Sequence, residues 1–287
     1  MVIRMVKPMN TDRSQSVGIA GPDPSWHLLY RIGGISAWIF VAMTVAAIAL
    51  AIATPPPPTA GGTATLSYIA AHRTLYIVYE QLWLVPGLFA MVTYLALYPA
   101  LKNLEKSLAA LGAVVGGSAW ALSLAIPVTT TGAPALVYLS DQFMAAADPA
   151  RRAVFTTAAE TLIAQNRTTV VVGPLMAVGM LIVSIVMLKG VFPKAVAYLG
   201  VATGVLGISA EALRMVFEGF YVFYGVLLPI WMGAVGWNLY RLGRSSGPGL
   251  VQNAPSPLGW TPWRRRCGDG ARLSDHRLFD GLRTGRR

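Results

Sequence analysis

The chain has 287 residues, of which 55% are hydrophobic and only 12% are charged, and its formal net charge is +11. Soluble globular domains carry about twice that charged fraction, so the composition excludes an ordinary soluble protein. The apolar residues recur in blocks near the roughly 20 residues that cross a bilayer, so the sequence predicts an all-α membrane protein. The single cysteine, Cys267, excludes an internal disulfide bond.

Residues 1–27 form a polar N-terminal segment, and the first apolar block follows at residues 32–53. This block ends in ALAIAT, which resembles the cleavage site of a signal peptide. Its apolar run exceeds the roughly 7–15 residues of a signal-peptide core, and its leader is unusually long. We therefore interpret it as an uncleaved transmembrane helix. The prolines of residues 55–58 end it, because proline lacks the backbone N–H that a helix needs.

Five further apolar blocks are each predicted to be a transmembrane helix: residues 75–97, 108–126, 170–188, 195–213 and 219–240. Tyrosine and tryptophan flank the first of these five, as expected at the two membrane interfaces. Pro86 and Gly87 near its middle predict a kink. Two GxxxG patterns, which begin at Gly112 and Gly200, predict close approach between neighbouring helices.

The long connection at residues 127–169 separates the third and fourth apolar blocks. Its apolar stretch at 134–147 is short and contains Asp141, so we expect it to be interfacial or packed on protein rather than spanning. Asp148 and Pro149 then match a helix N-cap and first helical position. The following helix is predicted to be amphipathic and to lie on the membrane surface or over the bundle. Its apolar face is formed by Val154, Phe155, Ala158, Ala159, Leu162 and Ile163.

Lysine and arginine are distributed unequally between alternate connections. One side holds 18 of these residues and the other holds 5. Basic connections stay in the cytoplasm, so both termini are predicted there, and a seventh helix at 134–147 would place the later basic connections on the wrong side. The predicted fold is a six-transmembrane-helix bundle over residues 28–242, in a cell membrane. It has a long extracytoplasmic loop that contains the amphipathic helix.

The tail at residues 243–287 is rich in proline, glycine and arginine. Such a segment cannot bury enough apolar surface to fold alone, so we expect a disordered, basic, cytoplasmic tail. Basic residues beside a membrane attract anionic lipid headgroups. Because a run of charge is a generic signal, a solvated tail is favoured over a specific lipid or nucleic-acid partner. The expected partner is the lipid bilayer, and a protein partner stays open.

Ionisable residues near the predicted extracytoplasmic ends of the helices are the candidate site. Ionisable groups inside a membrane are costly and usually face a partner or a cavity. The spacings from Glu211 to Arg214 and from Arg214 to Glu218 place all three on one helix face if the helix is continuous. The alternative is that Arg214 ties two helices together through carboxylates. The hypothetical polar cluster comprises Glu80, Glu211, Arg214, Glu218, Arg167 and His72, with Asn166 beside them.

Recognisable catalytic signatures are absent from the sequence. It contains no HExxH and no GxSxG pattern. The histidines His27, His72 and His276 are scattered over both predicted sides of the membrane, so a shared metal site is not expected. No lysine lies inside an apolar block, which excludes a retinal-type pigment. We expect no cofactor and no metal.

The block MLKGVFPKAVAYLGVATGVLGI at residues 187–208 resembles a connection and following helix of a bacterial membrane-protein family, the domain-of-unknown-function family 4386. The segments RIGGISAWIF and LPIWMGAVGWNLYRLG resemble the first and last helices of that family. The similarity covers about residues 29–242. It implies a polytopic protein of the bacterial cytoplasmic (inner) membrane and transfers no catalytic residues.

Three functions remain open from the sequence. The missing catalytic motifs favour a non-enzymatic membrane protein that acts by interaction or sensing. Prolines Pro86, Pro174 and Pro229 with the outer charges would suit a transporter or channel for a small solute, but no internal repeat is apparent. A membrane enzyme that uses Glu80 or Glu211 as acid or base is the third possibility.

Overall fold

The structure is a computed structural model that describes residues 21–55, 57–58, 61–125, 135–167, 171–214, 216 and 219–245. The predicted tail lies outside the described residues from residue 246 onward. Every described element is helical. They are η1 (Pro24–Trp26), α1 (His27–Ala53), α2 (Gly62–Ala71), α3 (Arg73–Leu84), α4 (Pro86–Leu101), α5 (Lys106–Ala125), α6 (Ala135–Ala145), α7 (Pro149–Arg167), α8 (Val172–Met187), α9 (Lys194–Ala212) and α10 (Gly219–Ser245).

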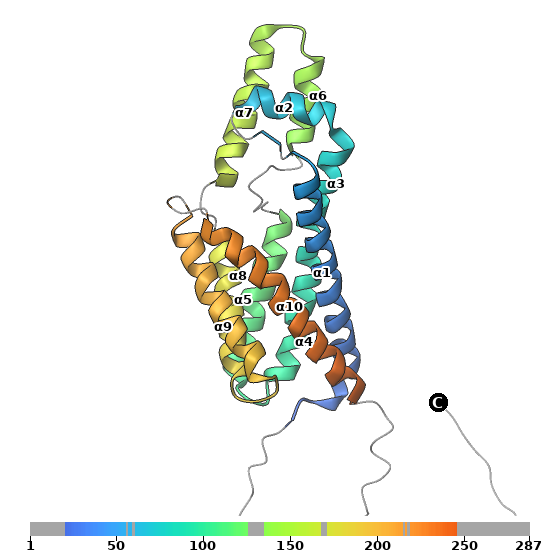
Figure 1. The fold of residues 1–287 in the computed structure, drawn as a ribbon, viewed down its shortest axis with the longest axis vertical. Coiled ribbons are helices and arrows are strands. Elements are labelled where there is room, and N and C mark those ends of the chain that lie inside the picture. The colour runs from blue at the N-terminus through green and yellow to red at the C-terminus, as the bar shows by residue number, and fades with distance from the viewer. Residues whose placement is uncertain are drawn as a thin grey trace, which may run out of the picture. The chain divides into compact units, whose positions relative to one another are not determined.

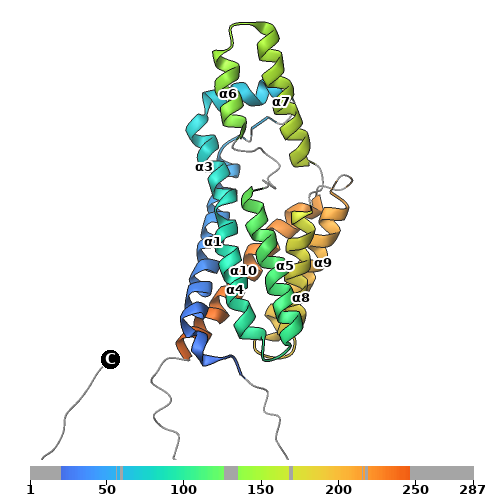
Figure 2. The same ribbon diagram turned by 180° about the vertical axis from the view of Figure 1, so that it is seen from behind.

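Six helices form a closed ring in the order α1, α4, α5, α8, α9 and α10, and α10 packs back onto α1 (Figures 1 and 2). Neighbours in the ring run in opposite directions. The end at which α1 begins carries Lys102, Lys106, Lys189, Lys194 and Arg241, and we name it the basic end. The opposite end leads to helices α2, α6 and α7, and we name it the cap end.

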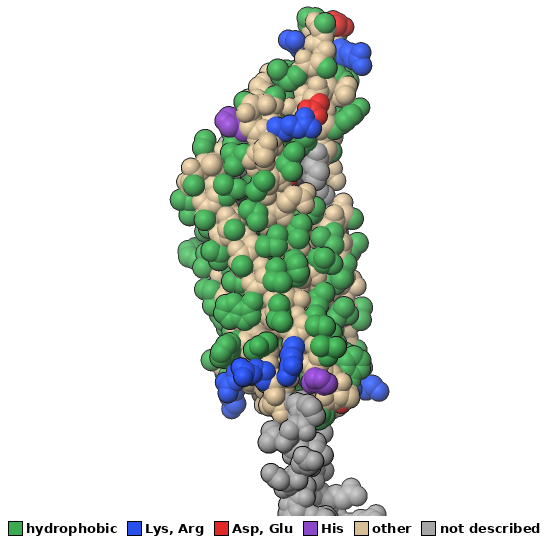
Figure 3. All heavy atoms as spheres, turned by 90° about the vertical axis from the view of Figure 1, so that its right-hand side faces the viewer, with side chains coloured by type: hydrophobic (Ala, Val, Ile, Leu, Met, Phe, Trp, Pro, Cys, Tyr) green, Lys and Arg blue, Asp and Glu red, His purple; other side chains and the backbone are tan. Residues whose placement is uncertain are grey.

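Five helical segments among the described residues are long and apolar enough to cross a membrane, as in a multi-pass membrane protein: Pro24–Ala53, Arg73–Leu101, Lys106–Ala125, Lys194–Ala212 and Tyr221–Ser245. The sequence predicts a sixth at 170–188, where α8 is apolar but has only 16 residues. Such a helix is roughly 24 Å long, shorter than the roughly 30 Å hydrocarbon layer. Figure 3 shows apolar side chains over the middle of one face and charged side chains toward its two ends.

The predicted kink in the second apolar block is confirmed as a break between two helices. Helix α3 ends at Leu84, and α4 starts with Pro86 at its first position. Proline fits that position because its missing N–H would have no helical partner there. The break separates α3, which lies beside α1 and α2, from α4, which belongs to the ring.

Helices α2, α6 and α7 pack on one another and form a cap with its own apolar core. Its buried side chains are Leu66, Ile69, Tyr76, Leu136, Phe143, Ala159 and Ile163. The Gly62 N–H donates to the Glu160 carboxylate over 3.2 Å, which places a negative charge at the N-terminus of α2. The Ser140 hydroxyl donates to the Leu66 carbonyl over 2.7 Å. An exposed ion pair between Arg73 and Asp141 joins α3 to α6.

Two sequence predictions concern the cap directly. The Asp148 carboxylate accepts a hydrogen bond from the Ala150 N–H at 3.1 Å, so the predicted N-cap of α7 is confirmed. On the apolar face predicted for α7, Ala159 and Ile163 are buried in the core of the cap, whereas Val154 is 64% exposed. Helix α2 was not predicted from the sequence, although its Leu66 and Ile69 have the i, i+3 spacing of a buried helix face.

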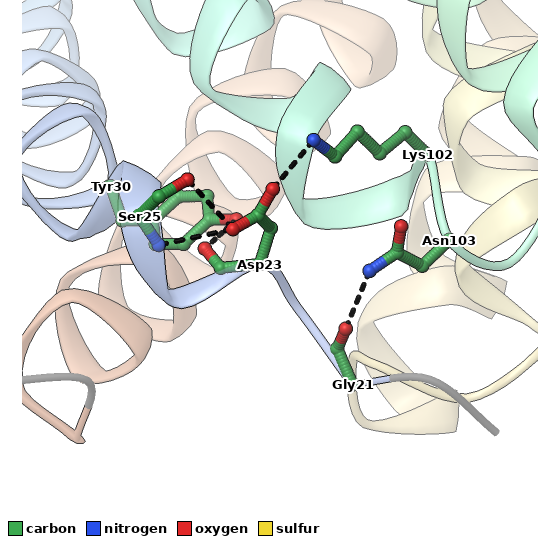
Figure 4. Close-up of polar contacts among 6 residues, drawn as sticks. All are labelled: Gly21, Asp23, Ser25, Tyr30, Lys102 and Asn103. Atoms are coloured by element: carbon green, nitrogen blue, oxygen red, sulfur yellow. Dashed lines mark hydrogen bonds and ion pairs between the residues drawn. The ribbon is translucent and has the colours of Figure 1, made fainter. Parts of the chain in front are cut away.

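The segment before α1 is fixed across the end of α4 at the basic end (Figure 4). Lys102 Nζ donates to the Asp23 carboxylate at 2.7 Å, and the Asn103 amide donates to the Gly21 carbonyl at 2.7 Å. The hydrogen bonds from Lys102 and Ser25 lower the pKa of Asp23 to about 2. Lys102 also lies 5.4 Å from the centroid of the Trp26 ring, so the start of α1 and the end of α4 are held together.

Helices α5 and α8 approach each other through glycine, as the GxxxG pattern predicts for Gly112 and Gly116. A Cβ added at Gly179 would lie 2.4 Å from the Cα of Gly116, and backbone cannot rotate away as a side chain can. In lipid no hydrophobic effect drives helices together, so such close contact supplies much of the attraction.

Gly179→Ala is therefore expected to force α5 and α8 apart and to lower the melting temperature of the detergent-purified protein. Overpacking of this kind costs about 1–3 kcal/mol. Gly225→Ala on α10 is the matched control, because no atom lies within 4 Å of its added Cβ. Equal melting temperatures for the two variants would contradict the close contact.

Candidate functional site

An ion pair is buried where α9 ends, at the cap end of the ring. Arg214 Nη1 lies 3.5 Å from Glu211 Oε2, and the two side chains are 8% and 2% exposed. The Leu213 N–H bonds to the Ser209 carbonyl, and the Arg214 N–H follows with a longer bond to the Glu211 carbonyl. Arg214 thus sits just after the helix end, where unpaired carbonyls favour a positive charge.

Helix α10 closes the ion pair on one side with aromatic rings. The guanidinium carbon of Arg214 lies 5.1 Å from the centroid of the Tyr221 ring, a cation–π contact. The ring of Tyr224 follows one turn later, with its centroid 6.0 Å from that of Tyr221. We name Glu211, Arg214, Tyr221 and Tyr224 the outer cluster.

Helix α8 closes the outer cluster on another side through Gly173. A Cβ at Gly173 would lie 2.1 Å from Glu211 Oε1, so only glycine leaves room for this carboxylate. Gly173, Tyr221 and Tyr224 were not among the residues predicted for the site. The i, i+3 spacing of the two tyrosines is visible in the sequence, but the contact between Gly173 and Glu211 depends on how α8 packs against α9.

The structure brings Glu211 and Arg214 of the predicted cluster together, and the membership of the other predicted residues stays a prediction. Glu80 is buried on α3, which packs against α1, α2 and α4, whereas α9 packs against α8 and α10. His72 is exposed between α2 and α3, and its ring stacks on Tyr68 at 4.5 Å. Glu218 lies outside the described residues, as do the side chains of Asn166 and Arg167.

Polar groups continue from the outer cluster into the interior of the ring. Tyr94 on α4 and Trp231 on α10 lie with ring centroids 6.3 Å apart. A Cβ at Gly200 would meet both Ser184 Oγ and Trp231 Nε1 within 2.3 Å, so these two polar atoms converge on one glycine of α9. We name the set the inner polar chain: Tyr94, Trp120, Ser184, Tyr224 and Trp231, whose buried polar atoms have no hydrogen-bond partner among the described residues.

The outer cluster and the inner polar chain both cost folding free energy, and for this reason they are candidates for a functional site. Breaking a buried ion pair by removing one partner costs about 3–5 kcal/mol, and an unsatisfied buried polar group costs about 1–3 kcal/mol. The outer cluster offers a guanidinium for an anionic group and a carboxylate for a cationic group or a hydrogen-bond donor. No group of three or more His, Cys, Asp or Glu side chains gathers within the described parts of the chain.

Comparison with known proteins gives one match. The family described as Domain of unknown function (DUF4386) matches residues 29–242. This match confirms the resemblance seen in the sequence, over the same residues. No curated protein and no solved structure matches the chain.

Glu211→Gln is expected to destabilise the protein, because it leaves the Arg214 charge buried beside a neutral side chain of the same shape. The expected loss is about 3 kcal/mol or more, read as a lower melting temperature in detergent. Adding Arg214→Gln removes the second charge and should restore much of the stability.

The exposed pair of Arg73 and Asp141 provides the control, because exposed ion pairs contribute about 1 kcal/mol or less. Asp141→Asn should therefore change the melting temperature little. If Glu211→Gln has the same melting temperature as the wild type, the buried pair does not stabilise the end of α9. The same conclusion follows if the double variant has the lowest melting temperature of all.

Proposed function

The chain belongs to the DUF4386 family, a domain of unknown function, and from this premise we propose that it is a non-enzymatic membrane sensor that binds a small zwitterionic solute at the outer cluster. The observation that carries this proposal is the buried pair of Glu211 and Arg214, backed by Tyr221. A zwitterion presents an anionic group to the guanidinium and a cationic group to the carboxylate. The 3.5 Å separation is at the long end for a hydrogen bond.

We further propose six membrane spans, with α8 as the sixth. Helix α8 occupies a full place in the ring between α5 and α9, which is what a spanning helix needs for its packing. Helix α8 begins at Val172 at the cap end of the ring, and residues 168–170 before it lie outside the described part of the chain. A short span is accommodated by local thinning of the bilayer at a modest cost.

The proposed orientation places the basic end and both termini in the cytoplasm of a bacterial cell and the cap in the extracytoplasmic space. The distribution of 18 basic residues against 5 supports it, because basic connections stay in the cytoplasm. In this orientation the outer cluster lies at the extracytoplasmic end of the ring. The cap then supplies a folded surface on that side through which binding could be reported to a partner protein.

A second candidate function, transport of the same solute, is favoured by the inner polar chain. Its members come from α4, α5, α8 and α10 and extend from Tyr224 at the outer cluster to Ser184, one turn from the basic end of α8. Polar groups inside a membrane bundle commonly mark solute or proton pathways. A sensor requires only the outer cluster, whereas a transporter requires the inner polar chain as well.

The test is thermal unfolding of the detergent-purified protein against a panel of amino acids and betaines, with sugars as uncharged solutes. At a hundred times its dissociation constant, a ligand adds about 2.7 kcal/mol of stability, which corresponds to a rise on the order of 5 °C. We expect a zwitterion to raise the melting temperature of the wild type and not that of Arg214→Gln. Arg73→Gln, at an exposed arginine, should keep the response.

Transport measurements separate the two functions, and the thermal-unfolding result can reject the site. Uptake of the stabilising solute into proteoliposomes that depends on Tyr94 and Trp231 would identify a transporter, and binding without uptake would identify a sensor. A response that survives in Arg214→Gln, or a wild type that responds to no zwitterion, would contradict the proposed site.

A further inference from the structure

An apolar groove runs along the outside of the ring between α4 and α5. Its volume is about 590 Å³, and none of the residues of the outer cluster lines it. Leu95 of α4 and Val114 of α5 line it and are 51% and 64% exposed, so it is open to whatever surrounds the ring. Gly117 keeps it deep, because it has no side chain and a Cβ there would meet nothing closer than 3.7 Å.

The length of the groove corresponds to one leaflet of a bilayer. Its lining on α5 runs from Ala110 to Ala121, a rise of roughly 17 Å at 1.5 Å per residue. Half of a hydrocarbon layer roughly 30 Å thick is about 15 Å. A transmembrane helix of a second copy would need a contact along the full thickness, so the groove fits an acyl chain better than a helix.

The groove ends at the basic end, beside residues that suit a lipid headgroup. Trp26 and Tyr98 line this end, and such aromatic side chains prefer the boundary between hydrocarbon and water. The ion pair of Lys102 with Asp23 and the contact of Lys102 with Trp26 fix the indole in place. The Trp26 and Tyr98 side chains therefore close the groove at the level where a lipid headgroup begins.

Lys106 supplies the charge at that level. It lies four residues before Ala110, which in turn lies seven before Gly117, so Lys106 shares the helix face that lines the groove, one turn below it. Its side chain is exposed and forms no ion pair with a described residue, whereas Lys102 and Lys189 are each paired with a carboxylate. A cation beside an apolar groove is complementary to an anionic headgroup that carries an acyl chain.

We propose that this groove is a binding site for an anionic phospholipid of the leaflet at the basic end. One acyl chain lies between α4 and α5 above Trp26, and the phosphate of the headgroup contacts Lys106. The site is separate from the outer cluster and stands whether or not that cluster binds a solute.

The test is native mass spectrometry of the full chain, titrated with phosphatidylglycerol and with phosphatidylcholine of the same acyl chains. The wild type should bind phosphatidylglycerol more tightly. Lys106→Gln should weaken phosphatidylglycerol about fivefold and leave phosphatidylcholine unchanged, as expected for one basic residue at a membrane surface. Gly117→Leu fills the groove and should weaken both lipids on the order of tenfold.

Two controls match these variants. Lys194→Gln removes another exposed lysine at the basic end and should bind as the wild type does. Gly233→Leu fills a second apolar groove, between α1 and α10, where an added Cβ also has room, and should leave the binding of both lipids unchanged. If Gly117→Leu melts early, Ala121→Leu, one turn along the same groove, replaces it.

Three outcomes would overturn the site. If Lys106→Gln and Lys194→Gln lose equal affinity for phosphatidylglycerol, the lysines act through the overall positive charge of the basic end and not through a site at Lys106. If Gly117→Leu and Ala121→Leu both bind the lipids as the wild type does, the lipid binds elsewhere. Equal affinity of the wild type for the two lipids would remove the role of the headgroup charge.

Discussion

The ring depends on close backbone contact between helices that lipid gives no hydrophobic reason to associate. Gly116 and Gly179 allow α5 and α8 to touch, and Gly200 allows α9 to approach Ser184 and Trp231. Once these contacts fix the ring, they also fix what it buries. The Glu211 carboxylate reaches its position only because Gly173 of α8 leaves space there, so one type of contact builds both the scaffold and the outer cluster.

The outer cluster buries two opposite charges, and removing charges from water costs free energy. Arg214 gains from the carbonyl end of α9, from Glu211 and from the Tyr221 ring, and together these offset the cost of burying a guanidinium. A well-packed apolar group would stabilise such a position at least as well. We therefore propose that the two charges serve recognition of a charged ligand rather than stability.

The sequence was most informative where one segment carries its own signal. Apolar blocks predicted the ring helices, Pro86 predicted the break between α3 and α4, and Asp148 predicted the start of α7. It was least informative about contacts between distant segments. The short helix α2, hidden after a proline-rich connection, was missed, as was the contact of Gly173 with Glu211. The spacing of Glu211 and Arg214 predicted their pairing, but nothing in the sequence could reveal that Glu80 lies on a helix with different neighbours.

The most direct measurement of the central claim, that the outer cluster is reached from the extracytoplasmic side, is cysteine labelling in intact cells. Replacing Cys267 by serine gives a cysteine-free background. In it, a cysteine at Val216, which is 70% exposed beside Arg214, should react with a membrane-impermeant maleimide. A cysteine at exposed Ser107, at the basic end, should react only after lysis. The reverse pattern would place the cluster in the cytoplasm and contradict an extracytoplasmic sensor.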